Sequence, residues 1–224
     1  MPRVRSPQRF DTILEAATAV FAECGYRLAR IAEVARRAGV SPATVHLYAA
    51  SKEALFDLVL RRALHDPGVN AEALPYRLAA TAPVVERTWE RLLATADFPI
   101  LRGLAPSVPV GGADAELREV LREAYRWLRH HRHAILIIER CALDWPDLAA
   151  LFETQFRRGF AQRLAAHLER RTAQGVLRPT ADASTAAQVL VASISHFGLR
   201  APSLTHAGAE GVVLDLLTAA LRVT

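Results

Sequence analysis

The chain has few of the residues from which metal centres, disulfide frameworks and membrane spans are built. Its 224 residues include one methionine and two cysteines, Cys24 and Cys141. Two cysteines make neither a disulfide framework nor a cysteine-rich metal motif, so both are predicted to be small buried apolar side chains. The longest uncharged run, Ala183–Leu199, contains serine, glutamine and histidine. A run that is so short and polar does not cross a membrane, and we expect a cytoplasmic protein with no membrane partner.

The common catalytic motifs are missing as well. The chain contains no H-E-x-x-H, no G-x-S-x-G, no G-x-G-x-x-G and no P-loop. We therefore expect neither an enzyme nor a bound cofactor. The histidines His130, His131 and His133 could bind a metal together with Cys141 or Asp144. A polar helix end is the favoured interpretation, because no carboxylate lies at ligand spacing beside them.

Lysine is nearly absent, although the chain is basic. Lysine and arginine together number 28 against 23 acidic residues, and Lys52 is the only lysine. The net charge of +5 and the pI of about 9.8 are compatible with a polyanionic partner, but an ordinary basic surface gives the same values. With 51% hydrophobic and 23% charged residues, the composition is that of a globular protein with room for one or two domains.

Residues 30–52 have the pattern of two short helices joined by a tight turn. The apolar residues of Ile31–Ala38 recur at helical spacing, and Gly39 can adopt the left-handed conformation that ends a helix. Ser41 is a natural N-cap and is followed by proline, so a second helix is predicted over about 42–49. A short glycine-containing turn between two helices indicates a helix-turn-helix, whose second helix enters the major groove of DNA.

The region from Phe10 to Leu60 resembles the N-terminal DNA-binding domain of the TetR family of transcriptional regulators. The matching pieces are IL-AA---F at Ile13–Phe21, GY at Gly25–Tyr26, E-A-RAGVSPATV at Glu33–Val45, Tyr48, and SKEALF at Ser51–Phe56. The resemblance implies a ligand-responsive regulator, most often a repressor, which binds a near-palindromic DNA operator as a homodimer. A small-molecule effector of unknown identity would then bind the body and release the operator.

The resemblance also indicates which residues meet DNA. The expected DNA-binding residues are Arg30, Ser41, Pro42, Ala43, Thr44, His46, Tyr48 and Lys52. Ala43 and Thr44, near the start of the second motif helix, are the candidates for base-edge contact. Lys52 stands where the family places a phosphate contact, which positions the protein without reading a base.

Four positions depart from the family pattern. The family usually has threonine at Ala29, serine or threonine at Arg30, tyrosine at His46 and an aromatic residue at Ala49. An imidazole at position 46 can carry a charge near neutral pH, which a tyrosine hydroxyl does not. These departures motivate an alternative, a helical ligand- or partner-binding protein whose head has lost operator recognition. A helical enzyme is a third possibility, without a recognisable catalytic set.

The whole chain is predicted to be all-α and to have two parts. A DNA-binding head at 7–67 contains the motif at about 30–49, and a regulatory, effector-binding and dimerisation body follows at 68–224. The boundary is expected at His65–Pro75, where proline, glycine and asparagine cluster. Helices outside the motif are predicted at Pro7–Cys24, 51–64, Pro83–Ala96, Asp114–Cys141 with a break near His130–His133, Asp147–Gln174, Ala181–Gly198 and Ala207–Leu221.

The body offers candidates for an effector site and a dimer seam. The loop at 97–113 is expected to be either a functional lid or disordered. The candidate effector-binding residues are the aromatic residues Trp89, Phe98, Tyr125 and Trp127, although aromatic residues at helical positions are more often plain core. The apolar stripe at 148–168 repeats every four residues and therefore winds around its helix. The expected dimer seam comprises Phe156, Phe160, Leu164, Leu168, Val191 and Ile194.

Overall fold

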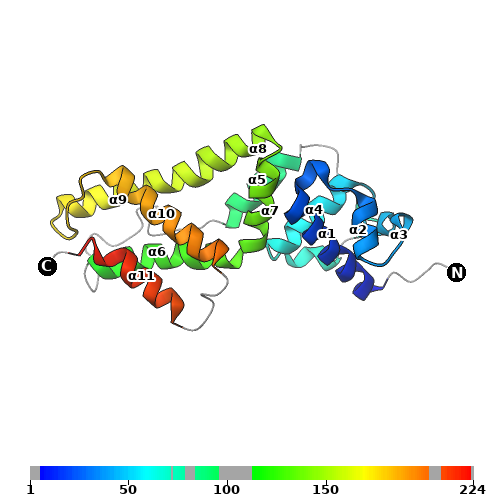
Figure 1. Cartoon of the computed structure of the whole chain (residues 1–224), viewed down its shortest axis with the longest axis horizontal. Helices are drawn as coiled ribbons and strands as arrows, with labels where there is room; N and C mark the ends of the chain where they lie inside the picture. The colour runs from blue at the N-terminus through cyan, green and yellow to red at the C-terminus, as the bar shows by residue number, and fades with distance from the viewer. Residues whose placement is uncertain (1–5, 72, 79–83, 96–112, 202–207, 223–224) are drawn as a thin grey trace. The chain divides into compact units, whose positions relative to one another are not determined.

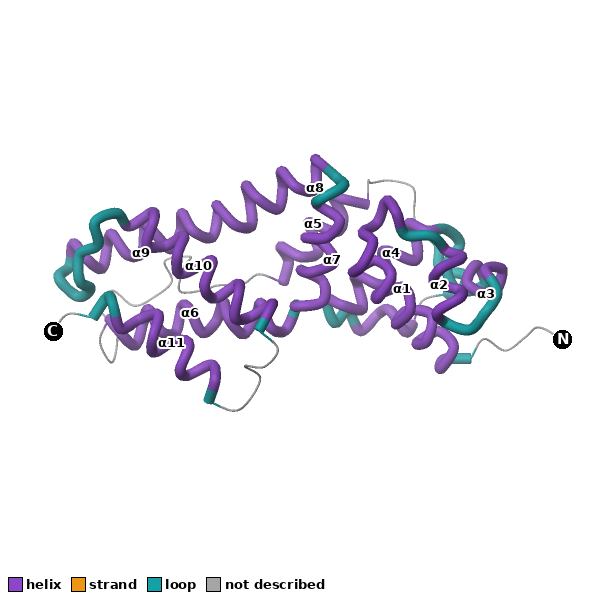
Figure 2. Tube along the Cα trace, in the orientation of Figure 1, coloured by secondary structure: helices purple, strands orange, loops and turns teal. Residues whose placement is uncertain are grey.

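The structure is a computed structural model that describes residues 6–71, 73–78, 84–95, 113–201 and 208–222. Within these ranges the regular structure is helical apart from one isolated β-bridge, so the all-α prediction is confirmed (Figures 1 and 2). Residues 97–112 of the expected loop, Phe98 among them, lie outside the described residues. No helix in the described ranges is both long enough and apolar enough to cross a membrane.

The chain divides into two units, and each is described by itself. Unit 1 comprises the described residues up to Thr95 together with His133–Leu151, whereas unit 2 comprises 113–132 and 152–222. This division differs from the expected cut after residue 67, because two later segments pack with the motif helices. The functional division into a DNA-binding head and a regulatory body remains a proposal.

Unit 1 begins with the helices of the motif. They are α1 (Pro7–Leu28), α2 (Ile31–Arg37), α3 (Pro42–His46) and α4 (Lys52–Ala63). Their core contains the fully buried side chains of Leu14, Phe21, Val45 and Phe56, and the rings of Phe21 and Phe56 meet edge-on at 4.9 Å between centroids. Burial of each such side chain stabilises the fold by about 1.5–3 kcal/mol.

Helix α1 extends beyond its predicted end at Cys24 through a kink at Gly25. Gly25 has φ +73°, which a residue with a Cβ adopts only under strain. A Cβ at this position would also lie 3.3 Å from the carbonyl oxygen of Arg140 and 3.2 Å from Oδ2 of Asp144. Glycine here lets one further helical turn form and lets the residues around Arg140 and Asp144 pack closely against it.

The rest of unit 1 comes from the middle of the chain. Its elements are η1 (Pro67–Ala71), α5 (Val84–Thr95), α7 (Arg132–Ala142, of which Arg132 belongs to unit 2) and α8 (Pro146–Leu151). Helix α5 buries Trp89 and Leu92, and α7 buries Ile135 and Ile138. The predicted break near His130–His133 is confirmed, because the preceding helix ends at residue 130.

Unit 2 is a group of helices around one apolar core. Its elements are α6 (Ala113–His130), the π-helical segment η3 (Phe152–Arg158), α9 (Gly159–Ala173), α10 (Ala183–Arg200) and α11 (Ala209–Ala219). Helix α10 packs against α9 and α6, and α11 packs against α6. Gly198 allows the close approach of α10 to α6, since a Cβ there would lie 3.2 Å from Cβ of Leu128.

The single helix predicted at Asp147–Gln174 is interrupted by η3. A stripe that repeats every four residues overshoots the 3.6-residue turn of an α-helix. The wider i→i+5 turn of a π-helix reduces this overshoot. Phe152 and Phe156 therefore remain on one side of η3, where their rings stack at 5.0 Å between centroids.

Candidate nucleic-acid interface

The turn between α2 and α3 has the geometry that the sequence predicts. Gly39 has φ +65°, and the Val40 N–H donates to the carbonyl oxygen of Ala35 at 2.9 Å, so that the end of α2 is capped by a left-handed glycine. Ser41 then caps α3, because its Oγ accepts a hydrogen bond from the Thr44 N–H at 3.1 Å. The helix-turn-helix is therefore formed by local backbone chemistry.

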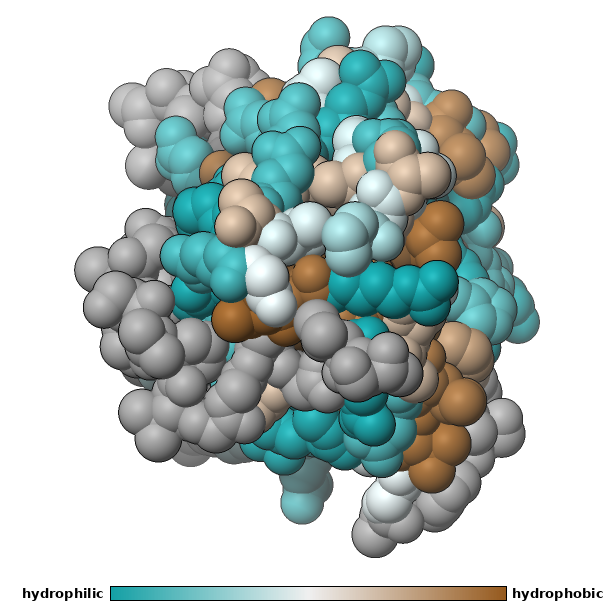
Figure 3. Space-filling view, turned by 90° about the vertical axis from the view of Figure 1, so that its left-hand side faces the viewer, coloured by the Kyte–Doolittle hydropathy of each residue, from teal (hydrophilic) through white to brown (hydrophobic). Residues whose placement is uncertain are grey.

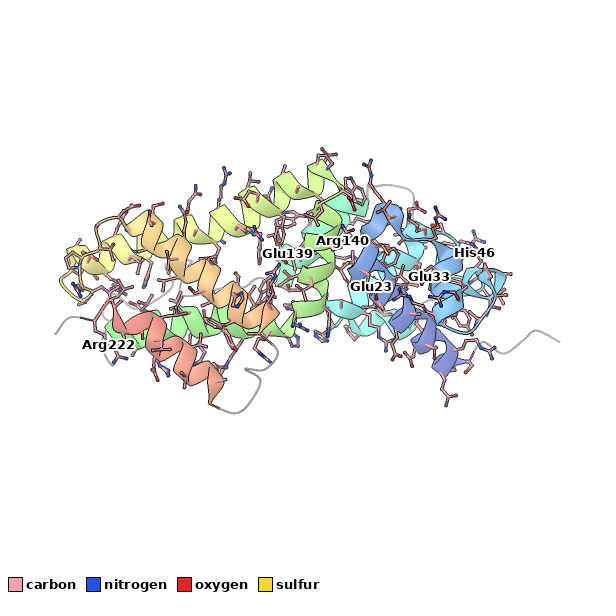
Figure 4. The ribbon with its side chains drawn as sticks, in the orientation of Figure 1. Glu23, Glu33, His46, Glu139, Arg140 and Arg222 are labelled. Carbon is pink, nitrogen blue, oxygen red and sulfur yellow. The ribbon has the colours of Figure 1, made fainter. Side chains whose placement is uncertain are left out.

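The outer face of α3 is small and polar. Ser41, Pro42, Ala43 and His46 are exposed, and Thr44 is half-buried with its hydroxyl 2.9 Å from Oγ of Ser41. Val45 points the other way, into the core. Figure 4 shows His46 at the outer side of the head, away from Arg140. Leu47, the C-cap residue of α3, is 43% exposed, so only the first turn of this face is free of bulky side chains.

Two of the expected DNA-binding residues are engaged inside the head. Tyr48 is only 3% exposed, and its ring stacks on that of Phe10 at 5.9 Å, so its side chain packs in the core. Nζ of Lys52 donates to the carbonyl oxygens of Arg27 at 3.1 Å and Ala29 at 3.0 Å. It also lies 4.7 Å from the centroid of the Tyr26 ring.

Lys52 therefore joins α4 to the corner between α1 and α2. Burial lowers the pKa of its ammonium group, which still has three N–H donors and uses two of them on carbonyl oxygens. Among the described residues, no partner is found for its third donor. The family's hydroxyl at the start of α2 is replaced by Arg30, which is exposed and makes no side-chain cap to α2 among the described residues.

A chain of ion pairs joins α1 and α2. The guanidinium of Arg37 forms two hydrogen bonds to Glu23, at 2.7 and 2.6 Å, and a third to Glu33 at 2.8 Å. Arg36 also binds Glu33. Hydrogen bonds from Arg36 first and then Arg37 lower the pKa of Glu33 to about 2. These exposed contacts orient α2 but contribute little stability individually.

Tyr26 connects the motif helices to the segment after α7. Its hydroxyl donates to Oε1 of Glu53 at 2.7 Å, and its backbone N–H donates to Sγ of Cys141 at 3.2 Å. Its ring stacks on Trp145 at 5.1 Å. Burial, followed by the bond to Glu53, raises the pKa of this hydroxyl, which therefore remains a donor. Cys141 is buried as predicted, whereas Cys24 is half-buried.

The candidate effector residues do not belong to one unit. Trp89 is buried in α5 of unit 1, and Tyr125 and Trp127 belong to α6 of unit 2. Within unit 2, the Trp127 ring lies 5.4 Å from that of Phe156 and 5.2 Å from that of His131. Sequence spacing suggested the aromatic residues of α6 but not this grouping with η3.

Most of the candidate dimer residues are buried in the core of unit 2. Phe160, Leu164, Leu168 and Ile194 are buried within the chain, while Phe156 and Val191 are half-buried. A side chain that is already covered by its own chain has little area left for a second copy. The surplus of apolar residues that suggested the seam is explained by packing between α9, α10 and α6.

The helix-turn-helix region also matches the sequence profile of a known protein family. The profile of the bacterial regulatory proteins of the tetR family matches residues 13–59. Residues 13–59 therefore have the sequence pattern of a TetR-type N-terminal domain. The match covers α2 and α3 and most of α1 and α4 of the TetR-type head, and it includes the exposed face of α3 described above.

Solved structures show that the TetR-type fold extends over the whole chain. The ketosteroid transcriptional regulator KstR2 of Mycobacterium tuberculosis aligns over 98% of both chains, with a TM-score of 0.53 and 17% identity. A TetR-like transcriptional regulator from Rhodococcus sp. RHA1 aligns over 96% of both chains, with a TM-score of 0.50 and 18% identity. No curated protein matches the chain. At such identities the likeness concerns the fold alone.

One residue of the head was not predicted by any sequence pattern. Tyr76 directly follows the boundary expected at His65–Pro75, yet it forms a parallel β-bridge with Ala49, shortly after α3. A pairing between residues so far apart leaves no periodic signal, and the irregular sequence around Tyr76 indicated only a loop.

Proposed function

We propose that the chain is a transcriptional repressor that binds a near-palindromic DNA operator as a homodimer and releases it when a small molecule binds. The observation that carries the proposal is the outer face of α3. Ala43 and His46 are exposed there, whereas Val45 on the same helix is buried. A helix whose inner face packs in the core and whose outer face carries small side chains fits the major groove of DNA.

The residues around α3 have distinct roles in this proposal. Ala43 and Thr44 are the candidates to approach base edges, because they lie in the first turn of α3. The exposed Arg30 and the remaining donor of Lys52 would contact phosphates, which position the head. Ala29 and Ala49, two of the departures from the family pattern, are buried, so they change the packing of the head rather than its outer face.

We propose a dimer seam on α10 and α11 in place of the buried stripe. Val189 on α10 is 57% exposed, and Val212 and Leu216 on α11 are 58% and 72% exposed. Val212 and Leu216 are four residues apart and share one face of the helix. Figure 3 looks onto the end of unit 2 and shows apolar residues gathered along its right-hand edge. Burial of these side chains between two copies would remove apolar area from water.

The effector would bind in unit 2, where Trp127 and Phe156 come together across α6 and η3. A π-helical segment inside a longer helix is frequently found at functional sites. Aromatic faces suit an apolar or aromatic small molecule. Its identity stays open.

Binding-site selection from random duplex DNA, followed by fluorescence anisotropy on the recovered duplex, tests the function. We expect specific binding that weakens steeply with salt, because phosphate contacts release counterions. Ala43→Glu should abolish it by placing a negative charge on the outer face of α3. Ala166→Glu is the matched control, since it adds the same charge at an exposed position of α9. If selection recovers no consensus sequence, the alternative of a ligand- or partner-binding protein is favoured.

A further inference from the structure

After α4 the chain turns back toward the end of α3. The Asp66 N–H donates to the carbonyl oxygen of Arg61 at 2.9 Å, and Oδ1 of Asp66 accepts from the Gly68 N–H at 2.8 Å. This turn sends the following residues back along α4. The segment 74–78, which we call the return segment, then reaches the short connection between α3 and α4.

The backbone of the return segment holds the exit of α3 with two hydrogen bonds. The Tyr76 N–H donates to the carbonyl oxygen of Tyr48 at 2.8 Å, and the Ala50 N–H donates to the carbonyl oxygen of Tyr76 at 2.9 Å. The two bonds bracket Ala49, which is buried. Backbone groups next to a buried residue need partners, and here the return segment supplies them.

The side chain of Tyr76 anchors the same segment to α4. Its hydroxyl donates to Oδ2 of Asp57 at 2.8 Å, and Asp57 is only 3% exposed. The guanidinium of Arg61 lies 5.6 Å from the centroid of the Tyr76 ring. Nη2 of Arg91 on α5 lies 3.6 Å from the same oxygen, Oδ2 of Asp57. Tyr76 is therefore connected to α3 through its backbone and to α5 through Asp57.

We infer that Tyr76 is a positioning residue for the DNA-reading helix and that it makes the position of α3 sensitive to α5. Helix α3 has only five residues. Its start is held by the Ser41 cap, and the return segment holds its end. Loss of the anchor leaves the Tyr48 carbonyl and the Ala50 N–H without partners and loosens the angle of α3. This inference rests on the proposed function and deepens its regulation.

Hydrogen exchange of single backbone amides tests the anchor without any DNA. Tyr76→Phe keeps the ring and removes the hydroxyl, so the Ala50 amide should exchange about five- to tenfold faster, as expected for one lost hydrogen bond. The amides of α1 should change much less. Thr18→Val is the matched control, because the Thr18 hydroxyl bonds only within α1, to the carbonyl oxygen of Leu14. An Ala50 amide that accelerates no more than those of α1 would overturn the inference.

The link to α5 is tested by a double-mutant cycle on the same amide. Arg91→Gln removes the charge that faces Asp57 and should accelerate exchange at Ala50 by itself. If Arg91 acts through the bond between Asp57 and Tyr76, the double variant Arg91→Gln/Tyr76→Phe should exchange no faster than Tyr76→Phe alone. If the accelerations of Ala50 exchange in the two single variants multiply in the double variant, α5 and Tyr76 act independently. The part of the inference that concerns α5 would then be wrong.

Anisotropy with the selected duplex and with a scrambled duplex completes the test. Tyr76→Phe should lower the ratio of specific to non-specific affinity about fivefold, while non-specific affinity and its salt dependence stay unchanged. An unchanged ratio despite a loosened Ala50 amide would overturn the role in DNA reading. If the unsubstituted chain selects no DNA, the proposed function fails, whereas the exchange results still decide whether Tyr76 positions α3.

Discussion

Two clusters of charged groups, one in each unit, lie in opposite environments. In unit 1 the cluster of Glu23, Glu33 and Arg37 lies at the surface and joins α1 to α2. In unit 2 the guanidinium of Arg171 on α9 binds Glu116 on α6 in the interior, and both residues are buried. Water screens the first cluster and not the second. The surface cluster can therefore exchange its charge partners, whereas the buried pair depends on its partners being kept.

The strongest test of this contrast removes a buried charge. Arg171→Met leaves Glu116 buried without a countercharge and should destabilise unit 2 by about 3–5 kcal/mol in urea unfolding. Arg37→Met, at the surface of the head, should cost far less. The double variant Glu116→Leu/Arg171→Met should recover much of the loss, since it buries no charge. Equal effects of Arg171→Met and Arg37→Met would contradict the contrast.

The second test concerns exposed apolar residues in the two units. Leu216→Glu should weaken dimerisation at least about a hundredfold, because each dimer loses two buried leucines and gains two facing charges. Leu143→Glu is the matched control, because Leu143 is an equally prominent exposed leucine of unit 1. Light scattering over a concentration series measures both. A dimer that survives Leu216→Glu and dissociates with Leu143→Glu would move the seam to unit 1.

The third test separates the two roles of Lys52. Lys52→Met keeps the side-chain stem against Tyr26 but removes the bonds to the carbonyl oxygens of Arg27 and Ala29. The head should lose about 1–2 kcal/mol of unfolding free energy. The slope of log affinity against log salt should fall by about one per subunit if the third donor meets a phosphate. Lost stability with an unchanged slope would leave Lys52 with a structural role only.

The smallest effect is a difference in pH response between the units. Burial first, and then the charge of Arg171, lowers the pKa of His167, while Glu116, whose Oε2 lies 3.7 Å from its Nε2, opposes the shift. The folded state thus binds this proton more weakly than the unfolded state. Unit 2 should lose stability as pH falls below about 6.5, by at most about 1.4 kcal/mol per pH unit.

The head should respond only at lower pH. The lowered pKa of Glu33 stabilises the fold above its ordinary value of 4.5, and this contribution is lost as pH falls toward about 2. Urea unfolding at several pH values, with His167→Gln as the variant, measures the difference. A slope between pH 6.5 and 5 that persists in His167→Gln would have another origin.

The same contrast explains what the sequence could predict. Gly39 and Ser41 act on their immediate neighbours, so the turn and the start of α3 followed from the chain alone. The break before α7 and the ends of α4 were also local. The two hydrogen bonds of Lys52 could not be predicted, because they need the carbonyl oxygens of Arg27 and Ala29 to lie near its side chain. These oxygens come into place only after α1 has bent at Gly25. The same holds for Glu116 and Arg171, whose pairing is set by how α6 meets α9.

Of the candidate site, the exposed positions were easier to predict than the engaged ones. Ala43 and His46 lie outside, as the helical period indicated. The ring of Tyr48 stacks on that of Phe10, a contact between distant residues that a helical period cannot show. The seam residues Leu164 and Ile194 were misjudged for the same reason: an apolar face does not reveal whether its partner is the same chain or a second copy.

The bonds of Lys52 make the chain open to a simple chemical assay. Since it is the only lysine, an amine-reactive reagent has one side-chain target. That amine is held against two carbonyl oxygens at the junction of α1, α2 and α4. These two hydrogen bonds should slow its reaction, so labelling should be faster when the junction opens. The rate of labelling at Lys52, followed by mass spectrometry, would therefore report the opening of the head without any engineered probe.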